Sequence, residues 1–179
     1  MAKYFYQLKI PKSRIAVLIG KEGEIKKQIE SETKTKISID SKEGDVSVIG
    51  EDGLSIYSAR EVINAIGRGF NPNVALLLLK GDYVFEKIDI TEHAGSKNAM
   101  TRLKGRIIGS GGKSRKLIEE LSGSYLTIYG KTIGIIGEPE NVALSRKAIE
   151  MLIKGSMHST VYRWLEKRGK ELRQSWGMK

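Results

Sequence analysis

The residues of this sequence that could do chemistry gather around a glycine-rich stretch, Ile107 to Lys116. It reads Ile-Ile-Gly-Ser-Gly-Gly-Lys-Ser-Arg-Lys, and Leu117, Ile118 and Leu121 follow with the spacing of an apolar helix face. We expect a short helix, a tight glycine turn and a second helix. Amides that open a helix are free donors at its positive dipole end, and glycine leaves room for a ligand backbone. The stretch predicts a site for a phosphodiester backbone.

Two other glycine motifs do not fit this stretch. A P-loop would need glycine at Ile107, and a dinucleotide-binding fingerprint would need glycine at Ser114. A plain turn between two helices remains an open alternative for the glycines taken alone.

A second copy of the pattern favours a functional turn. Ile19 to Gly23 lies 89 residues upstream, and Lys26, Lys27, Ile29 and Glu30 align with Arg115, Lys116, Ile118 and Glu119. The match continues into later apolar stretches, where 37–39 aligns with 126–128 and 48–51 with 135–138. Two copies with one small length change indicate a duplicated module.

Length and composition indicate two small domains. The chain has 179 residues and 40% hydrophobic residues, and the repeat divides it into modules of about 80 residues. We expect a first domain with a linker helix, a second domain and a basic C-terminal helix, over 1–80, 81–155 and 156–179. There is no cysteine, so disulfides and thiolate metal sites are excluded. We find no signal peptide, and the aliphatic run Val74 to Leu79 is too short to span a bilayer. We expect a cytoplasmic protein that has no membrane partner.

The charge is basic and unevenly placed. The net charge is +10 and the pI is about 9.7, which favours a polyanionic partner over a merely soluble basic surface. Between Arg102 and Lys116 there are six basic residues and no acidic one. The equivalent first turn and helix, Gly20 to Glu32, holds three lysines and four glutamates. The copies therefore differ where a nucleic-acid backbone would bind.

Apolar periodicity predicts the same order of elements in both modules: strand, helix, helix, strand, strand, helix. The fold class is α+β, with a three-stranded antiparallel sheet covered by helices in each module. We expect Ser13 to cap the first helix and 91–98 to form a polar loop. The expected strands are 4–10, 36–40, 45–50, 83–90, 125–129 and 132–137; the helices are 14–19, 24–33, 53–65, 99–108, 113–122, 139–154 and 157–176.

This order, with Gly-x-x-Gly between the paired helices, resembles the type I KH domain, twice. KH loops clamp the backbone of about four single-stranded nucleotides. The linker from Gly67 to Leu79, the stretch Gly105 to Lys113, and the ending Ser159-x-Val161-Tyr162 resemble one two-KH family. It is the small-subunit pre-rRNA processing factor called Dim-two, or partner of Nob, in its archaeal form. One departure is Ser110-Gly111, where many KH domains carry a basic residue.

The resemblance implies a ribosome-assembly factor at the 3′ end of small-subunit rRNA. Its implied partners are single-stranded rRNA, the Nob endonuclease, the rRNA dimethyladenosine transferase and the α subunit of translation initiation factor 2. No cofactor is expected.

We expect phosphates along the second turn and bases in a groove floored by Ile107, Ile108, Leu126 and Ile128, with core packing the alternative role for these side chains. Backbone near Leu126 and Ile128 would supply base-edge hydrogen bonds. The expected RNA-binding residues are Arg102, Lys104, Arg106, Ile107, Ile108, Gly109, Ser110, Gly111, Gly112, Lys113, Arg115, Lys116, Leu126, Thr127, Ile128 and Lys131. Weaker RNA binding or protein contact is expected at Gly20, Lys21, Glu22, Gly23, Lys26 and Lys27.

Other classes of protein remain as alternatives. We find no metal cluster, nucleophile–base pair or carboxylate pair at useful spacing, so we expect no enzyme. His93 and His158 lie far apart and are expected to be ordinary surface residues. A regulatory KH protein that binds mRNA is the main alternative, and a pure protein-interaction scaffold is the other.

Overall fold

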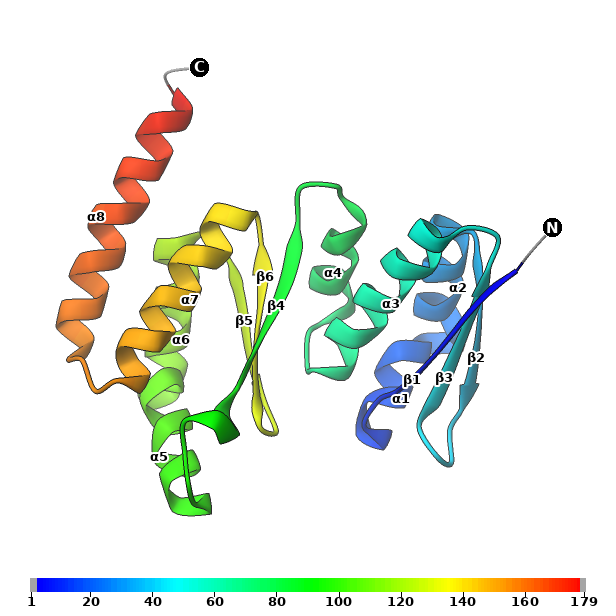
Figure 1. Cartoon of the computed structure of the whole chain (residues 1–179), viewed down its shortest axis with the longest axis horizontal. Coiled ribbons are helices and arrows are strands. Elements are labelled where there is room, and N and C mark those ends of the chain that lie inside the picture. The colour runs from blue at the N-terminus through cyan, green and yellow to red at the C-terminus, as the bar shows by residue number, and fades with distance from the viewer. Residues whose placement is uncertain (1–2, 178–179) are drawn as a thin grey trace. The chain divides into compact units, whose positions relative to one another are not determined.

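The computed structural model describes residues 3–177, which form two compact units divided between Tyr83 and Val84. Each unit has a three-stranded antiparallel sheet with helices on one face (Figure 1). Both units follow the predicted order of strand, helix, helix, strand, strand, helix, so the α+β prediction is confirmed.

The first unit places its third strand in the centre of the sheet, in the order β1-β3-β2. Its strands are β1 Tyr4–Lys9, β2 Thr35–Asp40 and β3 Asp45–Gly50. Its helices are α1 Lys12–Ile19, α2 Glu24–Thr33, α3 Gly53–Gly67 and α4 Pro72–Ala75, and a 3₁₀ turn at Leu76–Leu79 packs with α4 against α3.

The second unit repeats this topology with the order β4-β6-β5. Its strands are β4 Val84–Asp89, β5 Tyr125–Tyr129 and β6 Thr132–Gly137. Its helices are α5 Lys97–Ile108, α6 Lys113–Ser122, α7 Pro139–Ile153 and α8 His158–Gly177. Helix α8 has no counterpart in the first unit and packs on α6 and α7. It therefore belongs to the same compact unit as the second sheet.

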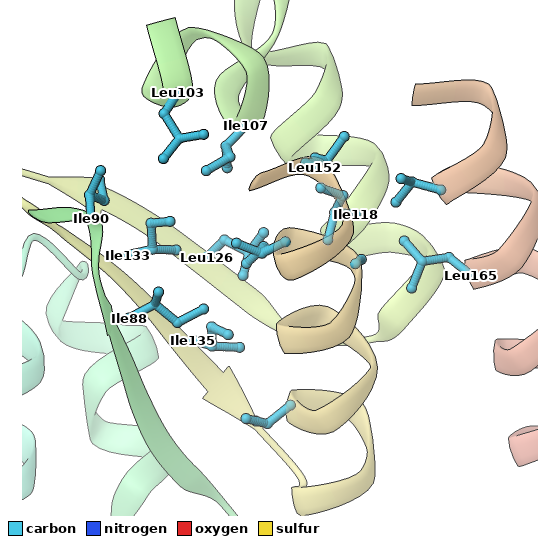
Figure 2. Close-up of a cluster of buried hydrophobic side chains, with 14 residues drawn as sticks. Ile88, Ile90, Leu103, Ile107, Ile118, Leu126, Ile133, Ile135, Leu152 and Leu165 are labelled. Atoms are coloured by element: carbon cyan, nitrogen blue, oxygen red, sulfur yellow. The ribbon is translucent and has the colours of Figure 1, made fainter. Parts of the chain in front are cut away.

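The core of each unit lies between the sheet and its helices. Alternate residues of a strand point to one face, and Val46 and Val48 of β3 and Ile133 and Ile135 of β6 are fully buried. In the second unit the cluster extends outward to Leu165 of α8 (Figure 2). The inward α3 residues predicted from helical spacing are confirmed, since Ile56, Ala59, Val62, Ile63 and Ile66 are buried.

The duplication also appears in the polar contacts beneath the helices. The Glu30 carboxylate accepts from the Ile37 amide at 2.7 Å, and Glu119 accepts from Leu126 at 2.8 Å. Buried hydroxyls follow both second helices: Thr33 with Thr35 in one unit, and a ring of Ser122, Ser124 and Ser145 in the other. These contacts fix the edge strand against the helix after each glycine turn.

Two local predictions were wrong. Helix α1 begins at Lys12 with Pro11 at its N-cap position, so Ser13 is not the cap. Helix α5 begins earlier than expected, at Lys97, because Ser96 caps it by accepting from the Ala99 amide at 3.1 Å. The start of the expected loop 91–98 belongs to a 3₁₀ turn, Ile90–Glu92. In the residues described, no helix is long and apolar enough to cross a membrane.

Candidate nucleic-acid interface

The glycine turn of the second unit joins α5 to α6 in a left-handed path. Gly109, Gly111 and Gly112 have φ angles of 73°, 60° and 77°. L side chains seldom adopt positive φ, so glycine suits all three positions. Lys113 then begins α6 in helical geometry. The turn thus points the opening amides of α6 outward as donors for an anion.

The glycines have two separate roles. A Cβ at Gly109 would lie 2.7 Å from both the Cβ and the backbone nitrogen of Ser114, so this glycine permits close packing beneath the turn. A Cβ at Gly111 would meet no atom within 4 Å, and one at Gly112 only the end of Lys116 at 4.0 Å. The outer glycines therefore leave a bare backbone surface that a phosphodiester can approach.

The predicted cations around this turn have different environments. In the described part of the chain, exposed Arg102, Lys113 and Lys116 make no ion pair. Arg115 is paired instead, with its Nη1 atom 2.9 Å from the Glu119 carboxylate. Lys104 is half-buried, and Lys131 is exposed in the turn between β5 and β6. Of the exposed cations without an ion pair, Lys113 and Lys116 lie next to the open turn.

Arg106 has a structural role that its sequence position did not reveal. Its guanidinium donates to the carbonyls of Leu152 and Ser156 at 3.3 and 2.6 Å, and so joins α5 to the end of α7 and to the segment between α7 and α8. The His158 ring completes this junction, with Nε2 2.7 Å from the Arg106 carbonyl. The expectation that His158 is an ordinary surface residue was wrong, because it is half-buried and bonded. His93 is exposed, as expected.

The apolar residues predicted to floor a groove divide into two kinds. Ile107 is fully buried and Leu126 is 3% exposed, and both point into the core (Figure 2). Their assignment to a groove floor is corrected to core packing, because both side chains are buried in the hydrophobic cluster of the second unit. Ile108, Thr127 and Ile128 are half-buried. Contact with a base through Ile108 and Ile128 stays a prediction.

The edge strand β5 could supply backbone hydrogen bonds to a base. Its other edge pairs with β6. The amide of Leu126 already donates to Glu119, so it is not an open donor. The backbone groups of residues two apart on a strand point to the same side. The Ile128 amide and the carbonyls of Leu126 and Ile128 therefore point outward, on the side of the Leu126 amide. The sequence alignment of Glu30 with Glu119 could have indicated this use of the carboxylate.

The first unit keeps the same turn with different side chains. Gly20, Glu22 and Gly23 have φ angles of 74°, 55° and 77°, so Glu22 holds a left-handed conformation that glycine holds in the second unit. Lys27 donates to the Glu22 carbonyl at 3.2 Å, and Lys26 lies 3.5 Å from Glu30. Lys21 is exposed. Two of its three cations are thus engaged locally, and a carboxylate lies where the other turn is bare.

No group of three or more His, Asp or Glu residues in positions 3–177 could hold a metal ion. The arrangement is one of donors and cations around an open turn, which suits binding of a polyanion.

Comparison with known proteins agrees with this geometry. Residues 84–170 match the model of the eukaryotic-type KH domain (KH-domain type I), and residues 5–65 match the KH domain. A KH domain-containing protein of Methanocaldococcus jannaschii is 46% identical over 172 residues, which cover 94% of this chain and 75% of that protein. The pre-rRNA-processing protein pno1 of Schizosaccharomyces pombe is 29% identical over 139 residues, 75% of this chain and 55% of its own length.

One chain of a solved structure is similar throughout. The structure is that of the a/eIF2α–aDim2p–rRNA complex from Pyrococcus horikoshii, and the chain in it matches with a TM-score of 0.88 and 47% identity. The match covers 94% of this chain and 96% of that one. The two units are therefore tandem type I KH domains with an added C-terminal helix. The chain belongs to the archaeal PNO1/Dim2-type family of two-KH-domain proteins.

Proposed function

We propose that this protein is a single-stranded RNA-binding factor of ribosome assembly, which binds near the 3′ end of small-subunit rRNA during pre-rRNA processing. The observation that carries the proposal is the open turn Gly109–Gly112, with unpaired Lys113 and Lys116 beside it. The S. pombe relative named for pre-rRNA processing and the P. horikoshii complex with rRNA support the choice of RNA.

The proposed mechanism is binding. Phosphates lie along the bare backbone of Gly111 and Gly112 and accept from the first amides of α6. Lys113 and Lys116 add attraction that salt weakens. Bases turn toward Ile108 and Ile128, where the outward backbone of β5 reads their edges. Single strands fit this mode because their base edges are not already paired.

The proposed partners extend to proteins. The α subunit of initiation factor 2 is supported by the P. horikoshii complex, and a Nob-type endonuclease and the rRNA dimethyladenosine transferase by the family resemblance. We assign protein contact to the first unit, which exposes large apolar side chains at Tyr4, Phe5, Ile49, Leu54 and Tyr57. The protein acts in the cytoplasm and without catalysis of its own.

The test is a fluorescence-anisotropy titration with the 3′-terminal segment of small-subunit rRNA. We expect tighter binding to the single strand than to the same segment in a duplex or to a scrambled strand of equal length. Equal affinity for strand and duplex would indicate a nonspecific basic patch. Cross-linking in cells adds the biological target: rRNA contacts support the proposal, whereas contacts scattered over mRNAs would support the regulatory alternative.

A further inference from the structure

A buried hydroxyl beneath the glycine turn has no hydrogen-bond partner. Ser114 is 2% exposed, and its Oγ atom makes no hydrogen bond in the structure. The other buried hydroxyls of the described chain, those of Thr33, Thr35, Ser122, Ser124 and Ser145, are all bonded. Buried polar groups are nearly always paired, so Ser114 calls for an explanation.

Its position links it to the turn. Ser114 is the second residue of α6, and its Cβ lies directly under Gly109, where a side chain would approach to 2.7 Å. The hydroxyl is thus buried between the turn and the start of α6. The opening amides of α6, which we assign to phosphate binding, lie on the same turn of helix.

The first unit shows that the fold does not need this hydroxyl. The equivalent residue, Ile25, has an apolar side chain under Gly20, with the same turn geometry above it. Burial of an unpaired hydroxyl destabilises a fold, whereas an apolar group of similar size does not. A serine that only filled space would therefore be a poor choice at position 114.

We propose that Ser114 is a positioning residue for RNA, whose hydroxyl gains a hydrogen bond when a phosphodiester seats on the Gly109–Gly112 turn. The proposal rests on the proposed function of that turn. Seating a phosphate on the outer amides draws the turn toward the ligand and brings a loop carbonyl or a phosphate oxygen within reach of Oγ. The Ser114 hydroxyl is then hydrogen-bonded in the RNA complex, whereas in the free protein its burial without a hydrogen bond destabilises the fold.

The test compares two variants of buried serines in α6 in the full-length protein. Ser114→Ala removes the unpaired hydroxyl, and Ser122→Ala removes one that is bonded to Ser124 and Ser145. We expect Ser114→Ala to raise the unfolding temperature yet weaken binding of the single-stranded rRNA segment by about three- to tenfold. We expect Ser122→Ala to lower the unfolding temperature and leave RNA affinity within about twofold.

Opposite signs in stability and affinity are the signature of the proposal, since loss of a merely structural hydroxyl would lower the unfolding temperature, as we expect for Ser122→Ala, and would not make the protein more stable while weakening RNA binding. If Ser114→Ala binds RNA as tightly as the wild type, the inference is wrong while the proposed function stands. A lower unfolding temperature for Ser114→Ala would also overturn it, because the hydroxyl would then have a partner in the free protein. If the wild type itself does not bind the segment, the proposed function fails first and this inference with it.

Discussion

The two glycine turns of this molecule have nearly the same backbone and different surfaces. Three of the four residues in each turn have matching φ angles, with 74° and 73° at the first glycine, 55° and 60° at the third position and 77° at both last glycines. The inner glycine is required for packing in both units, because a Cβ there would strike Ile25 or Ser114. The next two positions of the turn differ, since the first unit carries Lys21 and Glu22 where the second has Ser110 and Gly111.

The difference separates what the fold requires from what a ligand requires. A glycine at position 22 would avoid the left-handed strain that Glu22 tolerates, so the first unit is not built for the easiest turn. It is built with a carboxylate over the helix start. The second unit instead keeps the turn bare and places lysines around it, which is the arrangement a phosphodiester needs.

The strongest test of the comparison is to put charge on the bare turn. Gly111→Asp with Gly112→Asp should lower RNA affinity by about a hundredfold or more, because two carboxylates repel a phosphate at close range. Gly111→Asn with Gly112→Asn adds the same bulk without charge and should cost less. Anisotropy titration measures affinity, and circular dichroism checks the fold. Unchanged binding by a folded Asp variant would remove this turn from the site.

The converse change should sharpen the comparison. In the background of the two Asp substitutions, Glu22→Gly with Glu24→Lys gives the first turn the residue types of Gly111 and Lys113. We expect about a tenfold recovery of RNA affinity, because two carboxylates are removed and one cation is added near the helix start. The same titration measures it. No recovery would mean that features beyond the turn, such as its groove, prevent binding in the first unit.

The salt dependence of RNA binding should show a smaller difference between the two turns, and this difference can be measured as a slope. Lys113→Gln with Lys116→Gln should reduce the slope of log affinity against log salt by about 0.7 for each phosphate that is no longer neutralised. Lys26→Gln with Lys27→Gln is the matched control and should leave the slope unchanged, because these lysines interact with Glu30 and the Glu22 carbonyl. Titrations at four or five salt concentrations measure both. Equal slope changes in the two pairs would show that both turns face the same strand.

The smallest expected effect concerns how the helix after the third strand of each module begins. Asp52 caps α3, where the Ser55 hydroxyl and then the Ser55 amide donate to its carboxylate and hold its pKa below the ordinary value. A lowered pKa in the folded state stabilises the fold above about pH 4, and this contribution is lost as pH falls through the lowered pKa.

Asp52→Ala should therefore lower the unfolding temperature of the protein slightly at pH 7. The difference from the wild type should vanish in strong acid. Helix α7 begins instead at Pro139 and has no side-chain cap, so Glu138→Ala is the control and should show no such pH dependence. A difference for Asp52→Ala that persisted in strong acid would contradict the assigned cause.

The sequence by itself determined the duplicated fold. Strand and helix periods, two Gly-x-x-Gly turns and the alignment of Ile29 with Ile118 were sufficient to predict both modules, because apolar spacing and glycine act over a few residues. Charge counting also predicted that the second turn is better suited to RNA than the first, and this stays a prediction. These signals are local, so no tertiary contact was needed to interpret them.

Only the tertiary structure decided which residues near the turn remain available. Arg106 and Arg115 look equal to Lys113 in the sequence, yet one donates to the carbonyls of Leu152 and Ser156 and the other pairs with Glu119. Ile107 and Leu126 lie in the core, whereas Ile108 and Ile128 stay near the surface. The unpaired hydroxyl of Ser114 likewise appears only once α6 is folded under Gly109. Whether a side chain near the turn is available to a ligand depends on partners that lie far along the chain. Packing, and not spacing in the sequence, brings these partners close to it.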